Sequence, residues 1–274
     1  MCFQLPQTPD EWRIIADEFT TKWNFPHCVG AMDGKHVTIV KPGKSGSTFL
    51  NYKHTFSIVL MAVVDANYKF RYVNIGAQGR IGDAGVFNSC SLSKALERND
   101  LHFPDAEPVP GSDLIVPYML LADDAFPLKT YIMKPYSRRG MKHTERIFNY
   151  RLSRARRVVE NAFGILSSKF RVLRAPIALK TASVRCVVLA AICLHNFLRD
   201  RQVAARSMDD SVDMEDLQSG QLHEGGWRLN HRQDGLRNLK PQSGRVAVDA
   251  KQLREQLANY FINEGSVDWQ WRFI

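Results

Sequence analysis

Three acidic residues stand where a fold could bring carboxylates together. Asp33 lies at the start of a predicted strand, Asp123 at the end of another, and Glu160 in the middle of a long predicted helix. Ligand sites of α/β proteins gather at strand ends. Carboxylates placed side by side repel one another unless a cation lies between them. Hard oxygen ligands with few competing His or Cys residues suit Mg²⁺ or Mn²⁺. Two such ions about 3.5–4 Å apart could hold the attacking and leaving oxygens of a phosphoryl transfer.

Each acid also has a purely structural interpretation. Asp33 precedes a glycine and suits a turn. Asp123 and Asp124 could cap the segment that follows them. Glu160 lies four residues after Arg156, where a helical ion pair contributes only tenths of a kcal/mol. The metal-site interpretation therefore depends on the three acids acting together.

The charge balance favours a polyanionic partner. The 274 residues include 37 Lys and Arg against 28 Asp and Glu, a formal net charge of +9. This excess indicates nucleic acid first and an acidic membrane second. Charge runs usually form a solvated helix face, but basic residues beside metal ligands could hold the DNA backbone. The predicted DNA-binding residues are Lys134, Arg138, Arg139, Arg151, Arg154, Arg156 and Arg157.

Composition excludes several protein classes. A hydrophobic content of 45% and a charged content of 24% are ordinary for a globular protein, and they exclude a wholly disordered chain, a collagen and a coiled-coil rod. Five cysteines without a C-x-x-C pair indicate reduced thiols in an intracellular protein. The N-terminus does not have the pattern of a signal peptide. The longest apolar runs are too short to span a bilayer, so no membrane partner is expected.

Hydrophobic periodicity predicts the elements that position these residues. We expect helices at 9–24, 84–98, 143–170, 181–199 and 248–262. We expect strands at 36–40, 56–65, 69–75 and 116–122. Helix 181–199 is the most apolar, which predicts burial, whereas the polar, non-periodic stretch 200–247 suits a surface linker or disorder. Three strands, a helix, a strand and long helices indicate an α/β protein with a mixed sheet, in the order of the ribonuclease-H-like fold.

Five short motifs follow one another along the chain. They are GAMDGKH at 30–36, GRIGDAGVF at 79–87, LADDAFPL at 121–128, RRVVENAFGIL at 156–166 and LHNFL at 194–198. Together and in this order they resemble the DDE endonuclease domain of PIF/Harbinger transposases and of nucleases derived from them. The match runs from about 28 to 200. Each motif is weak alone, and the specificity comes from the full order.

The resemblance implies roles for the acids. Asp33, Asp123 and Glu160 would be the catalytic triad and the ligands of Mg²⁺ or Mn²⁺. Asp123 matches rather than Asp124 because it stands four residues before Pro127-Leu128. Asp83 stands where the family often has an acid, and we favour a helix N-cap over support of the metal ligands. The metals would activate water or a 3′-hydroxyl for attack on a DNA phosphodiester, by hydrolysis or strand transfer.

The resemblance also implies a biological setting. DNA would be the substrate, and a separate Myb-like protein would help to recognise it. The protein could form a homodimer. It would act in the nucleus, and a cytoplasmic pool is also compatible with the resemblance. The alternatives are a domesticated, catalytically silent DNA-binding or scaffold protein and a truncated relic, since relatives have a longer helical region before the first acid. The expected domains are a helical segment 1–27, a ribonuclease-H-like endonuclease domain 28–200, a polar linker or disordered insertion 201–247 and a C-terminal helical segment 248–274.

Overall fold

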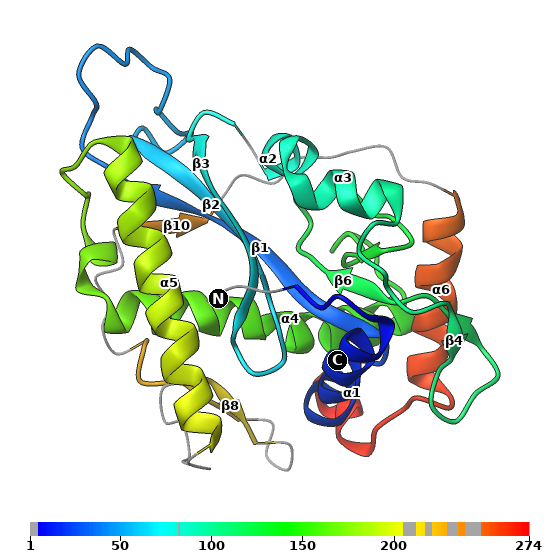
Figure 1. The fold of residues 1–274 in the computed structure, drawn as a ribbon. Helices are drawn as coiled ribbons and strands as arrows, with labels where there is room; N and C mark the ends of the chain where they lie inside the picture. The colour runs from blue at the N-terminus through cyan, green and yellow to red at the C-terminus, as the bar shows by residue number, and fades with distance from the viewer. Residues whose placement is uncertain are drawn as a thin grey trace.

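A mixed sheet forms the centre of the molecule (Figure 1). The computed structural model describes residues 5–81, 83–204, 212–216, 221–228, 235–238 and 248–273. Strands β1 (Cys28–Thr38), β2 (Ser57–Val64) and β3 (Phe70–Gln78) pair antiparallel, and β6 (Met119–Leu121) and β7 (Ile132–Met133) continue the sheet in parallel. Within the described residues the order is β3-β2-β1-β6-β7, and β10 (Leu236–Asn238) pairs with β1. The predicted α/β class with a mixed sheet flanked by helices is confirmed.

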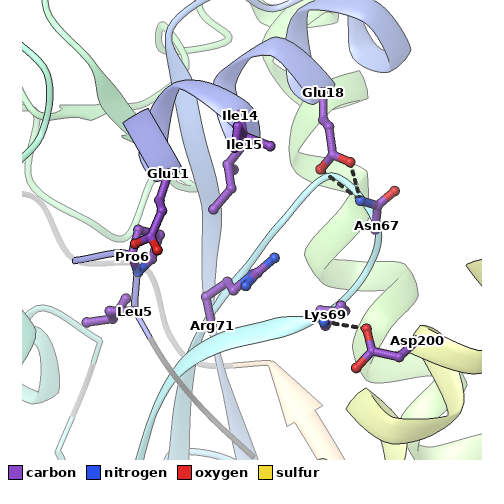
Figure 2. Close-up of a pocket in the computed structure, with 10 residues that line it drawn as sticks. All are labelled: Leu5, Pro6, Glu11, Ile14, Ile15, Glu18, Asn67, Lys69, Arg71 and Asp200. Atoms are coloured by element: carbon purple, nitrogen blue, oxygen red, sulfur yellow. Dashed lines mark hydrogen bonds and ion pairs between the residues drawn. The ribbon is translucent and has the colours of Figure 1, made fainter. Parts of the chain in front are cut away.

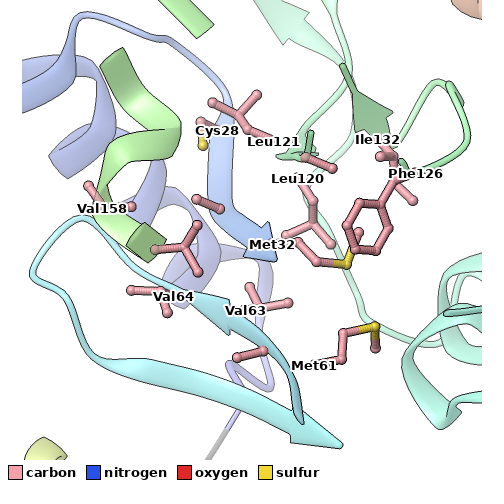
Figure 3. Close-up of a cluster of buried hydrophobic side chains, with 14 of the residues drawn as sticks. Cys28, Met32, Met61, Val63, Val64, Leu120, Leu121, Phe126, Ile132 and Val158 are labelled. Atoms are coloured by element: carbon pink, nitrogen blue, oxygen red, sulfur yellow. The ribbon is translucent and has the colours of Figure 1, made fainter. Parts of the chain in front are cut away.

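The core lies on β1, β2 and β6. All eight residues of β2 are buried, as expected for a strand that is covered on both faces. Figure 3 shows part of this core, where side chains of β1, β2, β6 and β7 meet Phe126 and Val158. The part of the sheet that carries Asp33 and Asp123 is therefore built on close-packed apolar side chains, which hold its geometry firmly.

Helix α4 (His143–Lys169) is the longest helix and carries Glu160. Its 27 residues contain no proline, and Glu145 accepts a hydrogen bond from the backbone N–H of Lys142 at 2.9 Å, which caps the first turn. The helix packs along β1, β2 and β6, while α1 (Pro9–Trp23) and α6 (Val248–Ile262) pack against it. The sheet and two helices thus fix the position of α4.

Two predicted elements are divided in the structure. The helix expected at 84–98 is α2 (Asp83–Ser89) followed by α3 (Ser91–Arg98), and the Cys90 sulfur between them accepts the N–H of Ser93 at 3.3 Å. The strand expected at 116–122 is β6 preceded by β5 (Ile115–Val116), which pairs with β4 (Glu107–Pro108) in a separate two-stranded sheet. Pro117 lies between β5 and β6 and lacks the N–H that one continuous strand would need.

Helix α5 (Thr181–Ala204) is buried on one face only. On that face His195 Nε2 donates to the carbonyl of Tyr68 at 2.8 Å, and Asn196 bonds both backbone groups of Phe70. The outer face is exposed, which differs from the buried helix expected from its composition. By length and apolar composition alone, Thr181–Arg201 meets the requirements of a membrane-spanning helix, and core helices of soluble proteins meet them too.

The described parts of 201–247 pack on the protein body, which differs from the linker expected from composition. Besides β10, they include a small hairpin of β8 (Met214–Glu215) and β9 (Leu222–His223). The indole N–H of Trp227 donates to the Asn161 side chain of α4 at 3.1 Å. Two short 3₁₀ helices, Arg171–Arg174 and Asp268–Phe273, complete the fold. The predicted domain limits remain a prediction.

Gly164 of α4 provides a test of the Trp227 contact. Alanine in place of a mid-helix glycine normally adds about 1 kcal/mol of stability. Here the new Cβ would overlap the Trp227 ring, a packing conflict that costs about 1–3 kcal/mol. We expect Gly164→Ala to lower the unfolding free energy measured in urea, and the same change in a Trp227→Ala background to raise it. Stabilisation in both backgrounds would contradict this packing.

Candidate active site

Strands β1 and β6 place Asp33 and Asp123 at the same level of the sheet. The two strands are parallel neighbours, and Ala31 pairs with Leu121. Each acid follows its paired residue by two positions. Side chains two residues apart in an extended chain lie on the same face. The register therefore brings two of the three predicted acids to one level of the sheet, Asp33 in the middle of β1 and Asp123 just beyond the end of β6.

Arg156 links Glu160 to these two acids. The guanidinium of Arg156 pairs with the Glu160 carboxylate one helical turn away. Burial alone would lower the pKa of Arg156, but the negative charges of Glu160, Asp33 and Asp123 outweigh it and raise this pKa. All three carboxylates are thus close enough to act on one guanidinium, as the motif order predicts.

Lys35 is the second cation of this cluster. Its ammonium group pairs with Asp33 at 2.9 Å and lies over the ring of Phe163 in α4, 5.6 Å from the ring centroid. Asp33 also accepts the N–H of Gly34 at 2.9 Å. The motif analysis missed Lys35. The strand period could have found it, because a residue two positions from Asp33 must share its face.

Asp123 has the least compensated charge of the three. Burial and then the charge of Asp33 raise its pKa, while Arg156, the N–H of Ala125 and Lys35 only oppose that rise. Its carboxylate accepts the N–H of Ala125 at 2.9 Å, so it also starts the following turn, as the structural interpretation held. Within the described ranges Asp123 has no ion pair. Its environment therefore favours a further cation.

The Asp124 side chain pairs with a different cation from those near Asp33 and Glu160. Its carboxylate pairs with Lys134 at 3.3 Å and its side chain is 69% exposed. Lys134 is itself buried, and its ammonium group also donates to the Asp124 carbonyl at 2.9 Å. The assignment of Asp123 rather than Asp124 to the triad stays a prediction.

The donor types fit a hard divalent cation, but the arrangement is not a closed cage. In the part of the chain that the structure describes, no three Asp, Glu, His or Cys side chains are close enough together to hold a metal ion. Glu160 is turned to Arg156, and Asp33 is held by Lys35. Coordination by all three acids would require Glu160 to leave Arg156.

A cleft of about 480 Å³ adjoins the acids. Asp123 and Arg156 lie in its wall, and the exposed Arg138 and Arg139 come from the loop before α4. Tyr136 and Asn149 also line it. A cleft that joins a carboxylate cluster to exposed arginines suits a phosphate backbone.

Arg151 and Arg154 are corrected from DNA-binding residues to structural ones. Arg151 is 2% exposed and donates to the Gln270 side chain at 2.7 Å and to the Gly265 carbonyl at 3.1 Å. Arg154 pairs with Glu215 at 3.0 Å. Burial, with the charge of Arg154, lowers the pKa of Arg151 to about 10. They attach α4 to later parts of the chain and cannot reach DNA from there.

Three further titratable residues, two of them predicted site residues and the third the last residue of the first motif, have different surroundings. Arg157 lies 3.6 Å from Glu215. Asp83 opens α2, and its side chain lies outside the described residues. His36 is buried beside Ser57, with Nδ1 2.9 Å from the serine hydroxyl, and burial lowers its pKa to about 4. His36 is thus a core residue.

A second cavity, of about 510 Å³, lies between α1, the β2–β3 hairpin and α5 (Figure 2). None of the predicted site residues lines it. Lys69 pairs with Asp200 at 2.5 Å, and the Asn67 amide donates to Glu18 at 2.7 Å. Its charged groups satisfy one another, and we assign it no chemistry.

Residues 32–196, more than half of the chain, match the family described as DDE superfamily endonuclease. The chain belongs to this family. It is 24% identical over 263 residues to "Protein ALP1-like" of Arabidopsis thaliana, covering 93% of this chain and 60% of that protein. It is 26% identical over 189 residues to "Putative nuclease HARBI1" of Bos taurus and of Homo sapiens, covering 67% of this chain and 49% of each relative. No solved structure gives a significant match.

The resemblance to Harbinger-type, transposase-derived nucleases is therefore confirmed. The family match contains Asp33, Asp123 and Glu160. The chain spans about half to three fifths of the length of these relatives.

The charge imbalance predicts a stabilising substitution. Because the pKa of Asp123 is raised by folding, its ionised form destabilises the fold above that pKa, and this cost disappears below the ordinary Asp pKa near 4. We expect Asp123→Asn to add about 1 kcal/mol of stability at pH 7 in metal-free buffer, and to lose this gain on acidification. Asp124→Asn is the control and should change stability little. Equal effects of both substitutions at pH 7 would contradict the assignment.

Proposed function

We propose that this chain is a divalent-metal-dependent DNA endonuclease of transposase origin with a ribonuclease-H-like fold. The observation that carries the proposal is the convergence of Asp33, Asp123 and Glu160 on Arg156. The strand order β3-β2-β1-β6-β7, antiparallel and then parallel, supports the fold assignment. The family match supports the reaction class.

The three carboxylates would hold Mg²⁺ or Mn²⁺, which when bound supplies charge neutralisation for in-line displacement at a phosphodiester. Asp33 and Asp123 are fixed by the register of β1 and β6, so they need little rearrangement. Glu160 would become the third metal ligand by leaving its ion pair with Arg156 and binding the metal. Arg156, once released, lines the cleft and can hold a phosphate oxygen. Positioning and charge neutralisation supply most of the rate in such reactions.

The alternative is a catalytically silent DNA-binding or scaffold protein. The ion pairs Arg156–Glu160 and Lys35–Asp33 favour it, because two cations of the chain already offset two of the acids. The uncompensated Asp123 favours the nuclease. We propose DNA as the substrate in either case, with action in the nucleus and a Myb-like protein to help select the target.

Cleavage separates these functions. We expect the wild type to cut a labelled DNA duplex with Mg²⁺ or Mn²⁺ and not with EDTA. Asp123→Asn should lower the rate by about 100-fold or more, because a lost ligand removes charge stabilisation of the reacting phosphate. Asp124→Asn, next to it and turned to Lys134, should stay within a few-fold of the wild type. Loss of cutting in both variants, or in neither, would contradict the triad.

Salt dependence tests the DNA-binding residues. Each phosphate contact contributes about 0.9 to the slope of log affinity against log salt. We expect Arg138→Ala with Arg139→Ala to reduce this slope by about 2, because both side chains are exposed at the cleft. The matched control is Lys94→Ala with Arg98→Ala on α3, two exposed cations outside the cleft. An equal loss in both double variants would indicate a general charge effect and no defined binding surface.

A further inference from the structure

Helix α5 presents an apolar stripe on its outer face. We call the outer stripe the residues that recur there every three or four positions and are exposed or half-buried: Ser183, Cys186, Val187, Ala190, Leu194 and Phe197. Leu194 is 53% exposed and Phe197 is 52% exposed. Leu189 and Leu198 flank the stripe and are also exposed. Large contiguous apolar surfaces of this kind mark interaction sites.

The helix cannot turn this stripe inward. His195 and Asn196 bond the backbone of Tyr68 and Phe70, and the ring of Phe70 packs edge-on to the His195 ring with 5.0 Å between ring centroids. These contacts fix the opposite face of α5 on β3. In the described parts of the chain the guanidinium of Arg201 lies over the Phe197 ring, 4.7 Å from the ring centroid, and about half of Phe197 still remains exposed.

We propose that the outer stripe is the interface between two copies of this chain, with their α5 helices packed antiparallel about a twofold axis at Ala190. In that register Phe197 of one copy faces Ser183 of the other, and Leu194 faces Cys186. Each large side chain meets a small one, and Ala190 meets its own copy, which allows the helices a close approach. A twofold interface requires this self-complementarity of one surface, and large-on-small packing fills a helix–helix contact.

Charge selects the antiparallel direction. Antiparallel helices bring the exposed Lys180, just before α5, near Asp200 of the other copy, whose exposed carboxylate also pairs with Lys69 of its own copy. Parallel helices would place Arg201, which lies at the end of the stripe, against Arg201 of the other copy. Charges at the rim of an interface contribute little affinity but set orientation. The 21 residues Thr181–Arg201 form a contact about 31 Å long.

A membrane is the competing occupant for an apolar helix of this length. The second copy is favoured because small residues lie at the centre of the stripe, where a close helix contact needs them. The inner face is moreover held by polar bonds to the β2–β3 hairpin, so the helix cannot leave the protein body without breaking them.

Sedimentation velocity of the full chain at tens of micromolar tests the interface. We expect a dimer of twice 31.2 kDa for the wild type. Leu194→Glu should give a folded monomer that still melts cooperatively, because it places a charge in the contact and none in the core. The matched control is Ile14→Glu, which adds the same charge at an exposed residue of α1 and should remain a dimer. A monomeric wild type, or a dimer that survives Leu194→Glu, would overturn the proposal.

A disulfide tests the register. A residue on the twofold axis faces its own copy, so Ala190→Cys in a Cys186→Ser background should form a covalent dimer under mild oxidation. Ile14→Cys in the same background should not. Absence of the Ala190→Cys cross-link in a protein that still sediments as a dimer would overturn the axis. A monomer that floats with phospholipid vesicles would assign the stripe to a membrane and overturn the dimer.

Discussion

Repulsion between the Asp33 and Asp123 carboxylates is the constraint around which the site is arranged. The register of β1 with β6 fixes these two acids at one level of the sheet, and α4 adds Glu160. Two cations of the chain, Lys35 and Arg156, offset part of this charge, and Asp123 keeps a raised pKa because the compensation is incomplete. A carboxylate with a raised pKa beside a cleft is typical of functional sites, where stability is given up for chemistry.

The rest of the molecule holds α4 against this strain. Its apolar face packs on β1, β2 and β6. Its buried arginines, Arg151 and Arg154, bond the segment around Gln270 and the β8–β9 hairpin. Trp227 packs at Gly164 on the same helix. Parts of the chain distant in sequence thus fix the helix that carries Glu160, while Glu160 itself pairs with the neighbouring guanidinium of Arg156.

The sequence predicted the fold class, the long helices and the convergence of the acids, because periodicity and motif order report on buried strands and strand ends. The sequence did not distinguish the buried arginines of α4 from those that lie near the acids. Arg151 and Arg156 are five residues apart, so they face different sides of a helix, and only the packing of α1 and α6 shows which side is buried. It also missed β10 and Trp227, since a three-residue strand and a single aromatic contact leave no period. For α5, the apolar composition indicated burial of the whole helix. Burial depends on how many faces of the helix pack against other elements, which composition does not report.

We propose that Asp33, Asp123 and Glu160 form one divalent-cation site in which the Arg156 guanidinium supplies part of the positive charge that a metal would bring. Calorimetric titration of the metal-free protein with Mn²⁺ tests it most directly, for the wild type, Arg156→Gln and Arg157→Gln. We expect the wild type to bind Mn²⁺ saturably. Arg156→Gln should bind Mn²⁺ roughly tenfold more tightly, because about 1.4 kcal/mol of repulsion between two cations is removed. Arg157→Gln should bind Mn²⁺ as the wild type does, because the Arg157 side chain lies near Glu215. Folded proteins that bind no Mn²⁺, or equal binding by wild type and Arg156→Gln, would contradict it.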